Sequence, residues 1–189
     1  MASYKKALAV VLKHEGGYVD DPVDRGGETY RGVARRFHPD WAGWRRIDTL
    51  RKKTGFPGSL DADKALQKAV ADFYRRHYWS PIQGDKLGDD TLAQELLDTA
   101  VNMGVRRAAR FFQEALNLLN RNQKNYADLI VDGWLGAKSL AALDELVKRD
   151  RNTRYLLKLL NALQAAHYIE IMRSNPSQER FARGWLNRT

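Results

Sequence analysis

From Glu15 to Gly32 the chain reads EGGYVDDPVDRGGETYRG, and this segment interrupts a sequence otherwise patterned for helices. Before it, residues 3–15 carry apolar side chains at helical spacing, which predicts a first helix ending at the double glycine. Gly16 is expected to take the left-handed conformation that closes a helix. The segment itself is dense in Asp, Pro and Gly, so residues 18–30 are predicted to form a loop or a short irregular hairpin.

Helical patterning returns after this segment and continues to the end of the chain. The expected helices span residues 31–37, 41–53, 62–77, 90–103, 106–120, 137–148 and 153–173, with a last short segment at 176–186. Asp61 or Asp63 can cap the helix at 62–77, and Asp89 can cap the helix at 90–103. The predicted fold class is mainly α, with a small irregular β or loop element at about residues 17–33.

The composition is that of a globular protein without special cofactor chemistry. The chain has 189 residues, 43% of them hydrophobic and 29% charged, and no cysteine, which excludes disulfides, cysteine zinc sites and thiol nucleophiles. The histidines are scattered, so we expect no metal and no cofactor. No apolar run approaches the roughly 20 residues of a membrane-spanning helix, so no stable membrane insertion is expected. The N-terminal residues suit a first helix better than a signal peptide.

The net charge of +9, from 32 basic and 23 acidic residues, favours a polyanionic partner. Nucleic acid and the anionic bacterial envelope both fit, and the charge also serves solubility alone. Because the sequence contains no nucleic-acid-binding motif, nucleic acid is not an expected partner.

Glu15 is the leading candidate for a general acid. It stands where the first helix ends, and the negative end of the helix dipole disfavours the ionised carboxylate, so its pKa is expected to be raised. A tight turn after Asp24 would return the chain over the helix end, where Asp24 and Thr29 can hold a water opposite Glu15. The spacing also allows plainer roles, with Asp24 as a turn former and Thr29 as an ordinary strand residue.

The segment resembles the signature of glycoside hydrolase family 108. The matching positions are Glu15-Gly16-Gly17-Tyr18, Asp21-Pro22, Asp24, Gly26-Gly27, Thr29 and Gly32. The resemblance implies a lysozyme-like helical fold and an N-acetylmuramidase, as in phage endolysins and secretion-assisting lysozymes. Such an enzyme cleaves the β-1,4 bond between N-acetylmuramic acid and N-acetylglucosamine, and the family's catalytic acid corresponds to Glu15.

The order Glu15, Asp24, Thr29 also resembles the catalytic triad of phage-type lysozymes. That resemblance implies inversion at the anomeric carbon. Thr29 follows Asp24 one residue sooner than is usual in those enzymes, which leaves the roles of Asp24 and Thr29 less closely matched than that of Glu15.

The second half of the chain resembles the predicted peptidoglycan-binding region that follows the catalytic part in family 108. The residues that match are 98–104, 107–109, 112–116, 132–136 with 139–140, and the ending at 181–185. The resemblance implies a catalytic part at residues 1–85, a helical peptidoglycan-binding part at 86–189, and a monomer whose partner is peptidoglycan.

Aromatic side chains are candidate platforms for sugar rings, whose apolar faces pack on aromatic rings. Tyr18 and Tyr30, which flank the acidic loop, are the foremost candidates. The other aromatic candidates, each equally suited to the core, are Trp41, Trp44, Trp79 and Trp134. Asn102 can bind an acetamido group or act with Gly104 as a helix C-cap.

Two other activities fit the same residues. A lytic transglycosylase also uses a single glutamate but needs no water-positioning group, and a non-catalytic peptidoglycan-binding module needs neither. The biological setting stays open between phage endolysin and secretion-assisting muramidase. In either case we expect synthesis in the bacterial cytoplasm without a signal peptide, and action on the wall in the periplasm after holin-type release.

Overall fold

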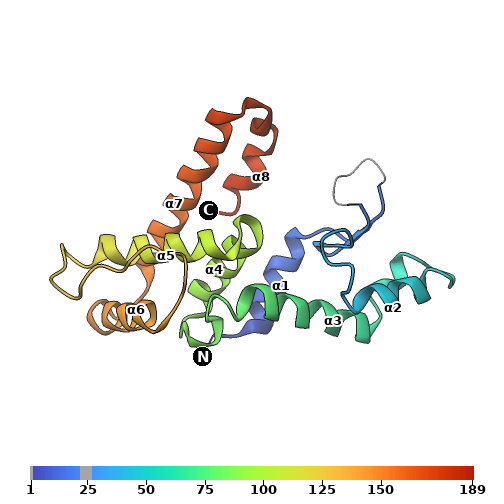
Figure 1. The fold of residues 1–189 in the computed structure, drawn as a ribbon, viewed down its shortest axis with the longest axis horizontal. Coiled ribbons are helices and arrows are strands. Elements are labelled where there is room, and N and C mark those ends of the chain that lie inside the picture. Colours follow the sequence, from blue (N-terminus) through green and yellow to red (C-terminus); the bar gives the residue numbers. More distant parts are fainter. Residues whose placement is uncertain (1, 22–26) are drawn as a thin grey trace. The chain divides into compact units, whose positions relative to one another are not determined.

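The computed structural model describes residues 2–21 and 27–189 and shows a mainly helical chain with one small sheet (Figure 1). The predicted fold class is thereby confirmed. The chain forms two compact units: the sheet unit, residues 8–77, and the helical unit, residues 2–7 together with 78–189. The division expected at residues 85/86 stays a prediction.

The sheet unit contains a three-stranded antiparallel sheet and two main helices. Its elements are the later part of α1 (Tyr4–His14), β1 (Tyr18–Val19), β2 (Thr29–Tyr30), β3 (Val33–Ala34), α2 (Gly43–Leu50), the 3-10 turn η1 (Gly58–Leu60), α3 (Lys64–Tyr74) and most of the π-helical turn η2 (Arg75–Trp79). In the strand order β1-β2-β3, Tyr18 lies opposite Tyr30, and Tyr30 lies opposite Val33. Tyr30 and Val33 are buried, so this face of the sheet packs on the core.

The prediction of a helix at residues 31–37 is wrong, because the chain reverses its direction there. Arg31 and Gly32 form the two-residue connection between β2 and β3, and both have positive φ, 44° and 76°. Positive φ at both positions is the requirement of a type I′ turn, whose twist matches the flanking strands. The expectation for Gly16 is also wrong, since its φ is not positive; among the described residues of this segment, the glycines with positive φ are Gly27 and Gly32.

The helical unit is built around α5 (Val105–Leu119). This helix packs against α4 (Asp90–Met103), α6 (Ala137–Asp150) and α7 (Arg154–Ser174), and α7 in turn packs against η4 (Pro176–Phe181) and α8 (Ala182–Leu186). A short 3-10 turn, η3 (Gly84–Lys86), precedes α4. Trp79, Leu96 and Phe112 are fully buried in this unit. Within the described residues, every helix is too short or too polar to serve as a membrane span.

The start of the chain belongs to the helical unit through contacts with Asp90. The Ser3 amide donates to Asp90 Oδ1 at 2.7 Å, and Lys6 Nζ donates to Asp90 Oδ2 at 2.8 Å.

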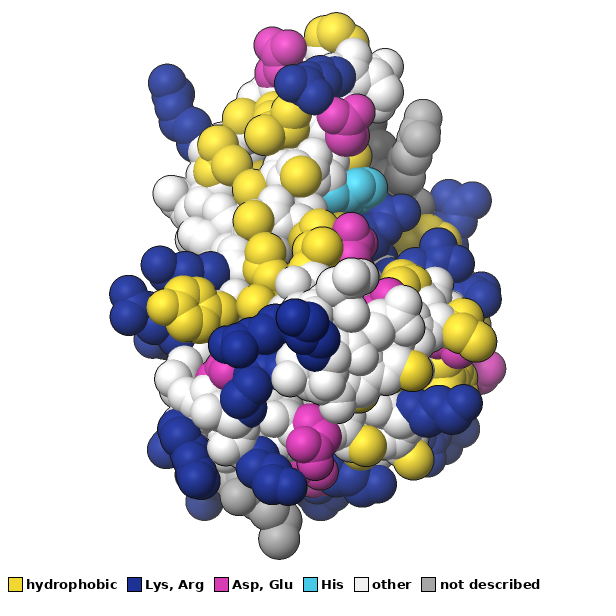
Figure 2. All heavy atoms as spheres, turned by 90° about the vertical axis from the view of Figure 1, so that its left-hand side faces the viewer, with side chains coloured by type: hydrophobic (Ala, Val, Ile, Leu, Met, Phe, Trp, Pro, Cys, Tyr) yellow, Lys and Arg dark blue, Asp and Glu magenta, His cyan; other side chains and the backbone are white. Residues whose placement is uncertain are grey.

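Two helix starts were predicted correctly. Asp63 caps α3 by accepting from the Leu66 amide, and Asp89 caps α4 by accepting from two amides of its first turn. Lys and Arg side chains are spread widely over the face shown in Figure 2.

Candidate active site

Glu15 lies directly after α1, and its carboxyl group rests against the backbone of Gly32. The Glu15 amide still donates to Val11 O at 3.3 Å, so the last helical turn positions the residue. A Cβ placed on Gly32 would lie 2.7 Å from Glu15 Oε2 and 2.6 Å from Tyr74 Oη, closer than atoms tolerate. The carboxyl group and the Tyr74 hydroxyl therefore converge on a spot that only glycine leaves open.

Backbone and side-chain hydrogen bonds hold the β2–β3 turn in this place. The Arg31 amide donates to Gly17 O at 3.2 Å, which ties the turn to the residues that follow Glu15. Tyr74, 1% exposed and the last residue of α3, donates from its hydroxyl to Arg31 O at 2.9 Å. The Arg31 guanidinium donates to Asp61 at 2.9 Å. The surroundings of Glu15 are thus fixed from the end of α1, from the sheet and from α3.

Thr29 lies in β2, partly buried, while Asp24 lies outside the described residues. Thr29 pairs with Val19 and Ala34, and Val19 is 47% exposed, so this face of the sheet is turned away from the core. Thr29 Oγ1 donates to Gly27 O at 3.2 Å. Because the hydroxyl hydrogen is used inside the turn, the Thr29 oxygen would act toward a water molecule as an acceptor.

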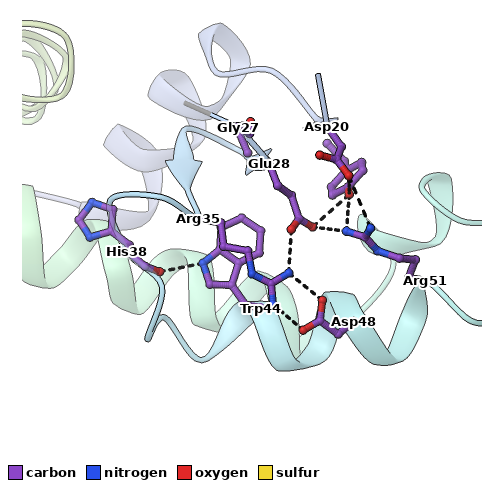
Figure 3. A network of polar contacts seen from close by, with 10 residues as sticks. Asp20, Gly27, Glu28, Arg35, His38, Trp44, Asp48 and Arg51 are labelled. Atoms are coloured by element: carbon purple, nitrogen blue, oxygen red, sulfur yellow. Dashed lines mark hydrogen bonds and ion pairs between the residues drawn. The ribbon is translucent and has the colours of Figure 1, made fainter. Parts of the chain in front are cut away.

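An ion-pair network joins the sheet to α2 (Figure 3). Glu28, whose side chain is 10% exposed, accepts from Arg35 at 2.7 Å and forms a short contact with Arg51. Arg35 also forms a bidentate pair with Asp48 at 2.8 and 2.6 Å. Both Glu28 oxygens are thereby occupied by guanidinium groups. Glu28 is a structural acid, although it stands in the same acidic segment as the candidate catalytic groups.

Tyr18 is part of this network. Its hydroxyl donates to Glu28 Oε1 at 3.0 Å and accepts from Arg51 at 2.6 Å, and its ring meets the Phe56 ring edge-on with centroids 4.9 Å apart. Burial, then the hydrogen bond to Glu28, raises the Tyr18 pKa well above its ordinary value. The hydroxyl therefore stays protonated as a donor. The ring is partly buried, and its role as a sugar platform stays a prediction.

Tyr30 does not offer the surface that a sugar platform needs. The residue is 1% exposed, its hydroxyl donates to Asp61 at 2.9 Å and accepts from Gln67 at 2.8 Å. Strand register turns the Tyr30 ring into the core, and its role in substrate binding stays a prediction. Trp44 and Trp79 are likewise 1% and 0% exposed and are core residues.

Asn102 lies in the last turn of α4, in the helical unit, whereas Glu15 belongs to the sheet unit. Its Nδ2 donates to Tyr168 Oη at 2.7 Å, and the capping position of α4 is taken by Gly104, with a φ of 90°. Asn102 also lines a small pocket of about 300 Å³ with Trp185. Its binding of an acetamido group stays a prediction.

The sequence motif does not indicate that Tyr74 belongs to the site. Gly32 belongs to the motif, but the motif alone does not reveal that its missing side chain makes room for Glu15. Tyr74 carries no local signal, because it reaches the site only through the packing of α3 against the β2–β3 turn.

Comparison with known proteins relates both halves of the chain to known families. The model of glycosyl hydrolase 108 matches residues 8–104, and the model of a predicted peptidoglycan domain matches residues 107–189. A solved structure, SagA of Brucella abortus, is 26% identical to the chain, with a TM-score of 0.60 over 98% of this chain and 88% of that one. No curated protein matches the chain.

The two matched segments together define a peptidoglycan hydrolase. The chain belongs to glycosyl hydrolase family 108 and carries a peptidoglycan domain behind the hydrolase segment.

Proposed function

We propose that the chain is a lysozyme that hydrolyses the β-1,4 bond between N-acetylmuramic acid and N-acetylglucosamine, with Glu15 as the general acid. One observation carries this proposal. The carboxyl group of the family's motif glutamate lies against the Gly32 backbone, beside the Tyr74 hydroxyl, and a turn with two positive-φ residues maintains that place. A fixed, partly buried carboxyl group is what proton transfer to a leaving oxygen requires.

The proposed reaction is a single inverting displacement. Protonated Glu15 gives its proton to the glycosidic oxygen as the bond from the anomeric carbon to that oxygen breaks. Water adds to the anomeric carbon from the opposite face, and its proton passes to the Asp24 carboxylate. Thr29 Oγ1, whose own hydrogen is directed to Gly27 O, accepts a hydrogen bond from the other O–H of the water and so helps to orient it. The reaction as written requires no metal and no cofactor.

The decisive experiment compares wild type with Glu15→Gln, which keeps the size and polarity of the side chain but removes the acidic proton. We expect wall hydrolysis to fall by about 10²- to 10⁴-fold, the usual contribution of general acid catalysis. Release of fragments from purified peptidoglycan measures the rate, and mass spectrometry identifies the new ends. Glu114→Gln, on the exposed face of α5, is the matched control.

Each outcome decides between the activities. Reducing N-acetylmuramic acid ends, absent with Glu15→Gln, support a lysozyme, whereas anhydro-sugar ends would identify a lytic transglycosylase. Full activity of Glu15→Gln would remove Glu15 from the mechanism. A wild type that binds walls without releasing fragments would be a non-catalytic binding module.

For the biological setting we propose a monomer that is made in the bacterial cytoplasm and reaches the wall through holin-type release. The match to a peptidoglycan domain and the +9 net charge, which suits an anionic envelope, support the wall as the site of action. Neighbouring genes distinguish a phage endolysin from a secretion-assisting muramidase, and light scattering in solution measures the oligomeric state.

A further inference from the structure

The loop between α5 and α6 is fixed to α5 by two side-chain amides. Gln113, 2% exposed, donates to Trp134 O at 3.1 Å and accepts from the Gly133 amide at 2.9 Å. Asn117 donates to Leu129 O at 2.9 Å and accepts from the Leu129 amide at 2.8 Å. The backbone of residues 129–134 is therefore held at both of its ends.

Gly133 shows how closely this loop approaches α5. Its φ is 81°, and a Cβ placed on it would lie 2.6 Å from Arg106 Cγ and 2.7 Å from the Arg106 carbonyl oxygen. Only glycine fits this contact, because both the conformation and the space exclude a side chain. The loop is thus a preorganised structure, although it contains neither helix nor strand.

This rigid loop presents large apolar side chains to solvent. Ile130 is 79% exposed and Trp134 is 77% exposed, and Val131 between them is 40% exposed. Exposed apolar side chains gathered in one place mark interaction sites in soluble proteins. Figure 2, which faces the side where α6 and this loop lie in Figure 1, shows hydrophobic side chains set among Lys and Arg.

A groove of about 610 Å³ lies beside these residues, in the size range of ligand pockets. Trp134 and Ile130 line it on the loop side. Ala137, Ala141 and Ala142 line it on the α6 side, and these small side chains leave room for an occupant. The groove is therefore mainly apolar and includes one large exposed aromatic ring.

The charges around the groove indicate what it binds. Its lining contains Asp128, Asp132 and Glu145 but one basic residue, Lys138, in a chain whose net charge is +9. The hydrogen bond that Gln113 donates to Asp132 is the main reason why the Asp132 pKa is lowered. This carboxylate therefore stays ionised and can act as an acceptor. Such a rim repels phosphates and carboxylates and accepts hydrogen bonds from hydroxyl groups. A neutral ligand with hydroxyl groups and a flat apolar face meets both requirements.

We propose that this groove binds the glycan strand of peptidoglycan, with the face of an N-acetylated amino sugar on the Trp134 ring and sugar hydroxyls donating to Asp132. The hydrolase segment that contains Glu15 is not part of this groove, so the groove is a second glycan site. It gives the matched peptidoglycan domain a defined contact surface. The choice of glycan rests on the proposed function, since both sites are assigned the same polymer.

The test is a titration of the full chain carrying Glu15→Gln with a short, neutral oligomer of N-acetylglucosamine. The titration is followed by NMR. The backbone amide signals of groove residues such as Ala141 report binding in the groove, separately from any binding near Thr29. We expect the signals of the groove to shift, and Trp134→Ala to weaken the affinity measured from them on the order of tenfold. Tyr155→Ala, which removes another exposed aromatic ring of the same unit, is the matched control and should leave that affinity unchanged.

A second variant keeps the result independent of Trp134 alone. Ala141→Arg places a long side chain inside the groove on an exposed, helix-compatible position and should also weaken the groove affinity. The proposal is overturned if the groove signals do not shift on addition of the oligomer, or if both variants bind it as tightly as the parent Glu15→Gln protein does. A response to stem peptide in place of the sugar oligomer overturns it as well. These results do not depend on catalysis, so the lysozyme proposal stands or fails separately.

Discussion

Gly32 connects the catalytic side chain to the fold at the scale of a single residue. Replacing it with alanine adds one carbon, in a conformation that costs about 1–2 kcal/mol for other residues, at 2.7 Å from Glu15 Oε2. The carboxyl group must then move. We expect Gly32→Ala to lower wall hydrolysis on the order of 100-fold, because displacement of a catalytic group by about 1 Å has this effect.

The control for this substitution is Gly58→Ala in the same unit, where φ is not positive and a Cβ meets nothing within 4 Å. Rates on purified peptidoglycan and unfolding temperatures separate the two effects. Activity of Gly32→Ala equal to that of Gly58→Ala would show that the Glu15 carboxyl position is not needed.

Some site residues could be predicted from sequence and others could not, for a physical reason. Glu15 and Gly32 stand in one local motif, which specifies identity and spacing. Tyr74 enters through tertiary packing, and the burial of Tyr30 follows from strand register, neither of which has a local signature. Arg31 at positive φ is likewise unexpected, because bulky residues rarely adopt that conformation.

At the scale of elements, the ion pairs of Glu28 attach the sheet to α2. Glu28→Gln removes a mostly buried charge and leaves Arg51 and Arg35 without their shared carboxylate. We expect a loss of about 1–3 kcal/mol in the free energy of unfolding, the usual effect when such a partner is removed. Denaturant unfolding of the two proteins measures it.

The comparison for Glu28 is an ion pair on the surface of the same unit. Asp72→Asn breaks the exposed pair between Lys68 and Asp72 on α3, and exposed pairs contribute about 0–1 kcal/mol. Equal losses for the two substitutions would contradict a structural role of the Glu28 network.

Glu95 makes the stability of α4 depend on pH. Burial, then repulsion by Asp98, raises the Glu95 pKa from 4.5 to about 7. Below pH 4.5 the carboxyl group is protonated in both the folded and the unfolded chain, so it does not change the free energy of unfolding. Between pH 4.5 and 7 the unfolded chain releases this proton more readily than the folded chain, so stability falls as pH rises.

Glu95→Gln should abolish this loss. Relative to wild type, the variant should gain unfolding free energy on the order of 3 kcal/mol between about pH 4 and pH 8. Thermal or denaturant unfolding at the two pH values measures the change, and Glu114→Gln on α5 is the control. A gain that is the same at both pH values would assign the effect of Glu95 to packing.

At the scale of the whole molecule, the helices with long apolar periodicity were predicted closely, and α4 was predicted to its exact ends. Their periodicity is local and their caps are readable, as Asp63 and Asp89 show. The helix expected at 31–37 failed because the turn at Arg31 and Gly32 overrides the propensity of the residues after it. The loop at 129–134 gave no signal of its order, since long-range amide contacts hold it.

The attachment of residues 2–7 to α4 has a consequence for synthesis of the chain. Ser3 and Lys6 leave the ribosome well before Asp90, with which they bond, because the whole sheet unit lies between them in the sequence. The contacts of residues 3 and 6 with α4 therefore cannot form until the sheet unit has been synthesised. A cut where the two family matches meet, between residues 104 and 107, would separate α4 from α5. The C-terminal fragment would then lack both α4 and residues 2–7.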